Sequence, residues 1–246
     1  SEGAVLVLGA DAGALDAAKR LSQRLDVTLV LTGSSGQGVS PSALMNFPVF
    51  SGKVDSATGH LGNFEVSLQT LSTSKPSSKA GYVFGKSGKA AKLKADLILD
   101  LRGDTPLFNA PGKRDGYFNP SPNDPVSIER ALFDLADMVG EFEKPRYVAY
   151  DASICAHARN GISGCTLCVD LCSTGAITSE NERIAIDPYV CAGCGSCAGS
   201  CPTGAVEYAM PSGIDTLARL RTLLGSYYKA GGKNAVILLH DREFGD

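Results

Sequence analysis

The spacing of apolar residues near the start of the chain predicts a strand, a helix and a second strand. Residues 4–8 (AVLVL) and 27–31 (VTLVL) are short apolar runs, as expected of buried strands. Between them, small and apolar residues recur at the spacing of one helix face: Ala14, Ala17, Ala18 and Leu21. This order and spacing are typical of a βαβ unit.

The pattern then changes to one that is typical of a small antiparallel excursion. Three strand-like segments follow one another, at 48–54 (PVFSGKV), 63–71 (NFEVSLQTL) and 81–84 (GYVF). An apolar run at 95–101 (ADLILDL) predicts a return to a buried strand. A helix is predicted over 121–140, with the N-cap at Asp124, the first residue at Pro125 and a stop at Gly140.

All eight cysteines lie between Cys155 and Cys201. Four of them, followed by Pro202, form a C-x2-C-x2-C-x3-C-P run, which is the bacterial signature for binding cubane iron–sulfur clusters: Cys191, Cys194, Cys197 and Cys201. The other four have C-x9-C-x2-C-x3-C spacing: Cys155, Cys165, Cys168 and Cys172. Disulfides are disfavoured because such close spacings suit metal ligation in a reducing compartment. Zinc is the stronger alternative, but its sites usually use two separated pairs.

The cysteine segment is an internal duplication. Residues 164–177 (GCTLCVDLCSTGAI) align with 193–206 (GCGSCAGSCPTGAV), and 147–155 (YVAYDASIC) align with 183–191 (RIAIDPYVC). Each half predicts a strand, a ligand loop, a short helix and a second strand. We expect a pseudo-twofold domain with apolar cover around the cysteines from four residues: Ile177, Ile186, Tyr189 and Val206.

Residues 147–210 resemble a two-cluster bacterial ferredoxin. In that family the fourth cysteine of each run binds the other cluster. The resemblance therefore implies two [4Fe-4S] clusters and assigns four ligands to each. One set is Cys155, Cys165, Cys168 and Cys201, and the other is Cys191, Cys194, Cys197 and Cys172. It also implies one-electron transfer between redox protein partners, as a component of a larger oxidoreductase complex.

Two features depart from the ferredoxin pattern. Ser173 replaces the proline expected after Cys172, and nine residues instead of two follow Cys155. The longer gap leaves three readings open: Cys155 binds, it fails to reach and a three-iron cluster forms, or His157 replaces it. We favour Cys155 because it keeps the sequence context of its duplicated counterpart.

Residues 2–110 resemble the FAD- or NAD-binding half of flavoprotein reductases, including the flavin subunit of heterodisulfide reductases. The G-x-G-x-x-G fingerprint is incomplete, because Asp11 occupies the second glycine position and would repel phosphate. We therefore expect a Rossmann-like domain that does not bind a dinucleotide. If FAD or another nucleotide binds, its phosphates would be lined by Gly9, Ala10, Gly13 and Ala14. The protein would then function as a flavin-linked oxidoreductase.

Charge and hydropathy limit the partners. The net charge of −3 argues against nucleic acid as the main partner. The sequence has no run of 18 or more apolar residues, so we expect no membrane span. With no signal-peptide pattern at the N-terminus, we expect a cytoplasmic protein. Two arginines against six acids give residues 147–210 a net charge of −4, which favours basic partner surfaces. Six lysines between 75 and 94 predict either a solvated loop or a docking patch for an acidic partner.

Together these patterns predict an α/β protein, α+β overall, with three parts. They are a Rossmann-like domain with an antiparallel insertion (1–146), a two-cluster ferredoxin domain (147–210) and a helix–strand tail (211–246). In the tail, apolar spacing predicts a helix over 214–228 and a strand over 234–241, with a structural role for His240. This pair either completes the N-terminal sheet or begins a further domain. Because Ser1 replaces an initiating Met, we expect a piece of a longer protein.

Overall fold

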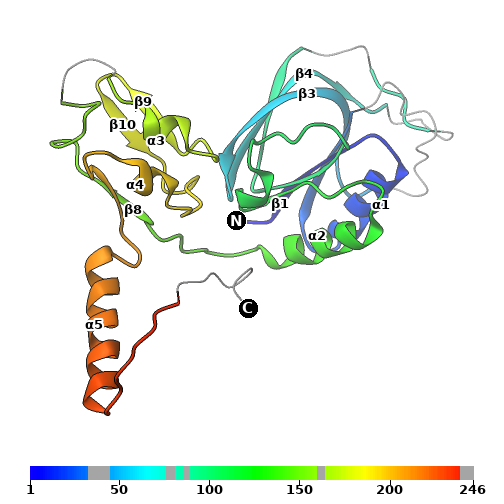
Figure 1. Cartoon of the computed structure of the whole chain (residues 1–246). Coiled ribbons are helices and arrows are strands. Elements are labelled where there is room, and N and C mark those ends of the chain that lie inside the picture. Colours follow the sequence, from blue (N-terminus) through cyan, green and yellow to red (C-terminus); the bar gives the residue numbers. More distant parts are fainter. Residues whose placement is uncertain (33–44, 76–80, 86–88, 160–163, 239–246) are drawn as a thin grey trace.

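The structure is a computed structural model that describes residues 1–32, 45–75, 81–85, 89–159 and 164–238. Figure 1 shows a large β-sheet domain, a smaller domain with short helices and hairpin-like strands, and the helix α5 (Gly213–Lys229) extending away from both. The chain is therefore a mixed α/β protein.

The first three elements form the expected βαβ unit. Strand β1 (Ala4–Gly9) pairs in parallel with β2 (Asp26–Leu31), and helix α1 (Ala12–Leu21) connects them. The α1 residues predicted to form a packing face are all buried. The helix begins after Asp11, whose carboxylate accepts a hydrogen bond from the Ala14 amide, as an N-cap does.

The sheet has seven strands in the order β5-β4-β3-β2-β1-β6-β7. Strands β3 (Val49–His60), β4 (Asn63–Thr73) and β5 (Ala91–Ala95) form the antiparallel part, and β6 (Leu97–Leu101) and β7 (Tyr117–Phe118) continue the parallel part beyond β1. The antiparallel excursion is confirmed, but its third strand is not the predicted 81–84. That segment makes one isolated bridge, between Ser74 and Phe84, while the third strand is Ala91–Ala95.

The predicted strand over 95–101 is two strands separated by Asp96. Its carboxylate accepts hydrogen bonds from the amides of Glu2 and Gly3, which holds the chain at the turn between β5 and β6. Two lysines of the predicted loop, Lys92 and Lys94, therefore lie on β5, and Lys92 pairs with Glu65 on β4. Two others, Lys79 and Lys86, lie outside the described residues.

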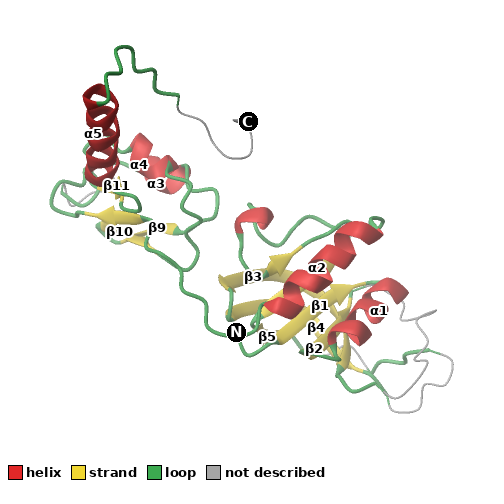
Figure 2. Cartoon of the chain, turned by 90° about the horizontal axis from the view of Figure 1, so that it is seen from below, coloured by secondary structure: helices red, strands yellow, loops and turns green. Residues whose placement is uncertain are grey.

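Apolar side chains on both faces of the sheet are buried. One face packs against α1 and α2 (Pro125–Asp137), which lie on the same side of the sheet (Figure 2). On the other face, β4 curls over so that Phe64 and Val66 pack with Leu6 and Leu8 of β1. Helix α2 begins at the predicted cap Asp124, but it ends at Asp137, three residues before the predicted stop.

The smaller domain has the pairing expected of a duplicated unit. The first strand of its first half, β8 (Val148–Tyr150), pairs with the last strand of its second half, β11 (Val206–Tyr208). The two middle strands, β9 (Ile177–Glu180) and β10 (Arg183–Ile186), pair with each other. Two short helices, α3 (Leu167–Asp170) and α4 (Ser196–Ser200), occupy equivalent positions in the halves.

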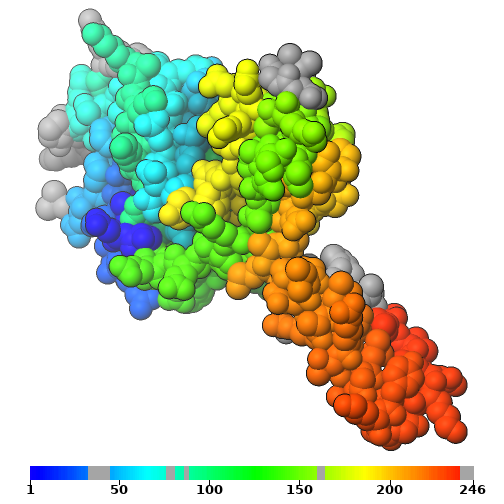
Figure 3. All heavy atoms as spheres, turned by 90° about the vertical axis from the view of Figure 1, so that its left-hand side faces the viewer, coloured from blue at the N-terminus to red at the C-terminus, as the bar shows by residue number. Residues whose placement is uncertain are grey.

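The tail differs from the expectation. Helix α5 forms over the predicted segment, starts at the N-cap Ser212 and buries none of its residues, and it protrudes from the body of the molecule in Figure 3. The strand expected over 234–241 is absent from its described part, 234–238, where Val236 is 91% and Leu238 78% exposed. These apolar side chains join neither the N-terminal sheet nor any other described strand, and His240 lies outside the described residues.

Among the described residues, no helix combines the length and the apolar character that are needed to cross a bilayer.

Candidate metal centre

The structure brings together the four cysteines of the first predicted set. They come from three places in the small domain: the loop after β8, the start of α3 and the end of α4. One cavity is lined by all four cysteines, which are Cys155, Cys165, Cys168 and Cys201. Apolar residues that include Ile184 and Val206 line the same cavity. Cys155 and Cys168 are buried.

His157 connects the segment that follows Cys155 to Cys165 and to β9. The imidazole is 1% exposed, and its Nδ1 lies 2.9 Å from the carbonyl oxygen of Cys165. Its Nε2 lies 3.0 Å from the hydroxyl oxygen of Ser179 on β9. Both ring nitrogens therefore have protein partners, and this arrangement favours Cys155 over His157 as the fourth ligand of the first set.

The second set also converges. Burial raises the pKa of the Cys197 thiol, and so does the proximity of three other thiols of this set: Cys191, Cys172 and Cys194. The same holds in the first set, where burial and the neighbouring thiols of Cys165, Cys155 and Cys201 raise the pKa of Cys168. In each group the other three thiols therefore lie near enough to act on the buried one, and in each group one member comes from the other half of the duplication.

Backbone amides and hydroxyls surround the thiols at the edges of both sets. The pKa of Cys194 is lowered by hydrogen bonds from the Ser196 amide and hydroxyl. Burial acts to raise the pKa of Cys201, but the amides of Val206, Thr203 and Ala205 and the Thr203 hydroxyl lower it overall. Hydrogen-bond donors of this kind stabilise negative charge on sulfur, as an anionic cluster requires.

Glycines with left-handed backbone conformations let the chain pass close to the second set. Gly193 has φ +69°, and a Cβ there would lie 2.8 Å from the ring of Tyr147. The phenol of Tyr208 donates a hydrogen bond to the Gly193 carbonyl at 2.8 Å. Only glycine meets both the positive φ and this close approach without strain.

The apolar cover agrees with expectation in all but one residue. Ile177 and Val206 are buried and Ile186 packs against them, while Ile184 adds to the same cluster. Tyr189, which was expected to join them, is 58% exposed. Its ring instead stacks on His60 of the N-terminal domain at 4.7 Å between centroids.

No three His, Cys, Asp or Glu side chains of the described residues are arranged to hold a single metal ion. This geometry concerns one ion bound by several side chains at once. In a cubane cluster each of the four thiolates binds a different iron atom, so the thiolates lie farther apart than they do around one ion.

Two threonines contact the last cysteine of each run. The Thr174 hydroxyl lies 3.6 Å from Cys172 Sγ, and the Thr203 hydroxyl lies 3.7 Å from Cys201 Sγ. Sequence reasoning did not single out these residues, although both lie in the duplicated segments 164–177 and 193–206. They are equivalent in the duplication, so the same contact occurs once at each set.

A contact between the two domains was also not predicted. The guanidinium of Arg114 donates hydrogen bonds to the carbonyls of Gly59 and Thr174, at 2.9 and 2.7 Å. Lys144 pairs with Asp115 and also donates to the Tyr189 carbonyl, both at 2.8 Å. No sequence pattern marks these contacts, because their partners lie tens of residues apart.

Two of the four residues predicted to line nucleotide phosphates, Gly9 and Ala14, pack against each other in the fold. Gly9 allows α1 to pack closely on β1, since a Cβ there would lie 2.4 Å from the Cβ of Ala14, which is buried. Ala10 and Gly13 are exposed, and Asp11 between them already accepts the Ala14 amide at 3.1 Å. The helix N-terminus is therefore capped by the protein's own carboxylate.

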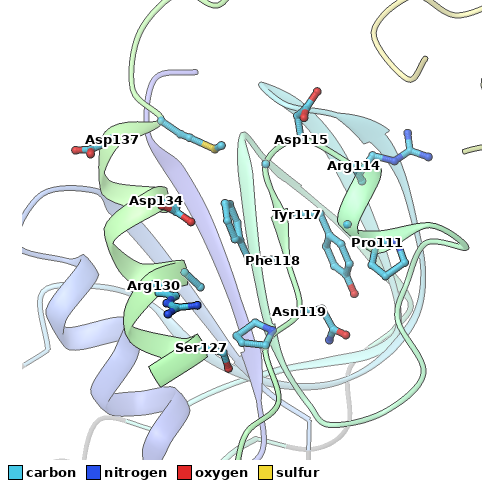
Figure 4. A pocket seen from close by; sticks show the side chains of 15 residues that line it. Pro111, Arg114, Asp115, Tyr117, Phe118, Asn119, Ser127, Arg130, Asp134 and Asp137 are labelled. Carbon is cyan, nitrogen blue, oxygen red and sulfur yellow. The ribbon is translucent and has the colours of Figure 1, made fainter. Parts of the chain in front are cut away.

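A separate cavity of about 700 Å³ lies between β7 and α2 (Figure 4). Phe118 faces α2 from β7, and Arg130 and Asp134 project from α2 on the other side. None of the residues predicted from the sequence as ligands or phosphate contacts lines it.

Residues 162–205 match a family described as a 4Fe-4S dicluster domain. The matched segment contains seven of the eight cysteines and begins after Cys155. It supports binding of 4Fe-4S clusters and iron–sulfur electron transfer by this part of the chain. A comparison with the curated proteins found no match.

Proposed function

We propose that residues 147–210 carry two [4Fe-4S] clusters and transfer one electron at a time. The first cluster would be held by Cys155, Cys165, Cys168 and Cys201, and the second by Cys191, Cys194, Cys197 and Cys172. The observation that carries this proposal is the cavity where Cys155 and Cys201 meet Cys165 and Cys168, although Cys155 lies outside the matched family segment. The proximity of the other three thiols of the second set to Cys197 supports the other half.

Each cluster supplies a site that accepts and releases one electron, and its potential follows its surroundings. The chain's own groups set those surroundings. The amides near Cys194 and Cys201 donate hydrogen bonds to sulfur, and Ile177, Ile184 and Val206 keep water from the interior between the sites. This role requires no general acid or base.

The protein acts as a component of a larger oxidoreductase and exchanges electrons with redox protein partners in the cytoplasm. Two features support this role. Cys194 is exposed, so a docked partner would come close to the second cluster. The apolar side chains of Ile214 and Leu223 on α5 are 82% and 68% exposed, as expected for a surface that a partner covers.

The N-terminal domain is Rossmann-like in this proposal, but it does not bind a dinucleotide at α1. The parallel order β3-β2-β1-β6-β7 supports the first part, because doubly wound nucleotide folds have equivalent strands in this order. Asp11 supports the second, because its carboxylate lies where a phosphate would accept the amides of the helix N-terminus. Because this strand order is that of nucleotide-binding folds, a flavin-linked oxidoreductase is the second candidate.

Metal and sulfide analysis of the anaerobically purified full chain tests the proposal. Two clusters correspond to about eight iron and about eight sulfide per chain. C155S should perturb only the first cluster, and C194S only the second, while R24Q on the far side of the N-terminal domain should change neither. Zinc without sulfide, or about four iron per chain, would reject two clusters. If C194S loses iron and C155S does not, Cys155 is not a cluster ligand.

A further inference from the structure

Arg114 of the N-terminal domain extends into the small domain. It follows the short helix η1 (Pro111–Lys113), and its guanidinium lies over the ring of Phe108 at 4.5 Å from the centroid. Stacking on Phe108 and the hydrogen bond to Gly59 fix its position from the N-terminal side. The hydrogen bond to the Thr174 carbonyl fixes it from the other side.

Thr174 connects this cation to the second set of cysteines. The threonine is 8% exposed, and its hydroxyl contacts Cys172 Sγ. Arg114 thus lies one residue away from direct contact with a thiol of the second set, and the charge of Cys172 acts on it. The neighbouring Lys113 acts on Cys194 of the same set.

The first set has a cation of the small domain nearby, because the charges of Arg183 and Cys155 both act on the Tyr150 phenol. The two sets are related by the duplication, but Arg114 and Lys113 of the N-terminal domain interact with thiols of the second.

The charge of Arg114 is poorly neutralised. Both hydrogen bonds that it donates within the described part of the chain go to neutral carbonyls, and its Nε is buried there without a partner. Asp187 and Asp115 act on it from a distance, and Asp115 pairs with Lys144. Burial lowers the pKa of Arg114, yet an arginine stays charged at neutral pH. Arg114 is half-buried, and such a charge is screened less than one in water, so its effect on neighbours is larger.

We propose that Arg114 raises the reduction potential of the second cluster. The inference rests on the proposed function. Reduction adds one negative charge to a cluster, and a nearby fixed cation stabilises the reduced form. Because the cation is near Cys172, the reduced form of the second cluster gains this stabilisation. Arg114 is a positioning residue here, since it touches a ligand's neighbour and no reacting atom.

An EPR-monitored redox titration of the full chain tests this inference. The two signals are assigned with C165S and C194S. R114Q should lower the reduction equilibrium constant of the second cluster about tenfold, which is about 59 mV for a one-electron couple, and leave the first unchanged. R114K keeps the charge, so the second cluster should retain most of its wild-type potential. R24Q is the matched control, because it removes the same charge from an exposed position and should shift neither potential.

The two variants separate charge from docking. The lysine of R114K cannot donate to both carbonyls in the planar geometry of a guanidinium. Equal shifts of the second cluster's potential in R114K and R114Q would therefore show that Arg114 acts by docking the domains, and would overturn the inference. An unchanged second cluster in R114Q would also overturn it, with the proposed function intact. A wild-type chain without two cluster signals would instead reject the proposed function, and the inference with it.

Discussion

His157 Nδ1 lies 2.9 Å from the carbonyl oxygen of Cys165, and this contact joins the residue two positions after Cys155 to the next cysteine of its set. The second ring nitrogen reaches Ser179 at 3.0 Å, so one buried side chain joins the loop to β9. A gap that departs from the ferredoxin spacing therefore still brings Cys155 to the cavity shared with Cys165.

We expect H157A to weaken the first site selectively. The substitution removes the two hydrogen bonds of the buried imidazole, and a typical hydrogen bond contributes about 0.5–1.5 kcal/mol to stability. Iron should leave the first cluster faster than the second when a chelator is added, followed by EPR. S179A breaks one of the two contacts and should have a smaller effect. Equal loss from both clusters would contradict this role.

Replacing Gly9 by alanine tests why a glycine stands at the end of β1. The added Cβ would lie 2.4 Å from that of Ala14, so G9A should lower the unfolding free energy by about 1–3 kcal/mol through overpacking. Chemical denaturation followed by far-UV circular dichroism measures this. G199A is the control, since a Cβ there meets nothing within 4 Å. A neutral G9A would contradict the packing role and favour a reserved ligand site.

Removing the cap of α1 should also destabilise the N-terminal domain. D11A deletes the acceptor of the Ala14 amide, and loss of an N-cap costs about 0.5–2 kcal/mol. The exposed D16A on the same helix should cost less, and urea unfolding compares the two. If D11A instead acquired tight FAD binding, the carboxylate would be what keeps a nucleotide out, and the flavin-linked candidate would gain support.

A buried polar group in the sheet domain gives a prediction for alkaline pH. The Tyr117 phenol donates to the buried carboxylate of Asp100 at 2.7 Å, and burial raises the pKa of Tyr117 well above its usual value. A raised pKa means that the folded state favours the neutral phenol. The associated stability is complete below the ordinary tyrosine pKa and is lost as pH rises toward the folded-state pKa.

Y117F should therefore lower stability at neutral pH by about 1–3 kcal/mol, because Asp100 loses a buried donor. It should also flatten the decline of stability above about pH 10, where tyrosine ordinarily titrates. Y228F is a control, since Tyr228 lies on α5 and is 53% exposed. An identical alkaline decline in wild type and Y117F would contradict this account.

The sequence predicted local features well and contacts between distant segments poorly. The βαβ unit and the Asp124 cap depend on residues within a few positions of one another, and they agree with the structure. The third strand of the excursion was misplaced because Ala91–Ala95 lies in a lysine-rich segment, where partners on β4 outweigh local propensity.

The tail and the domain contact show the same limit. The apolar pattern of 234–238 is that of a strand, but a strand needs a partner, and none is present among the described residues. The contact of Arg114 with Thr174 joins residues sixty positions apart. The periodicity of apolar residues along the sequence predicts local elements and not contacts of this kind. The cysteine spacing was informative because cluster ligation restricts it tightly.

Stepwise reductive titration of the anaerobic full chain, followed by visible absorbance, tests the central claim most directly. Two clusters that each accept one electron predict an uptake of about two electrons per chain. About four electrons would indicate an additional two-electron flavin and make the flavin-linked oxidoreductase the better account. An uptake of about one electron, or of none, would contradict a two-cluster electron carrier.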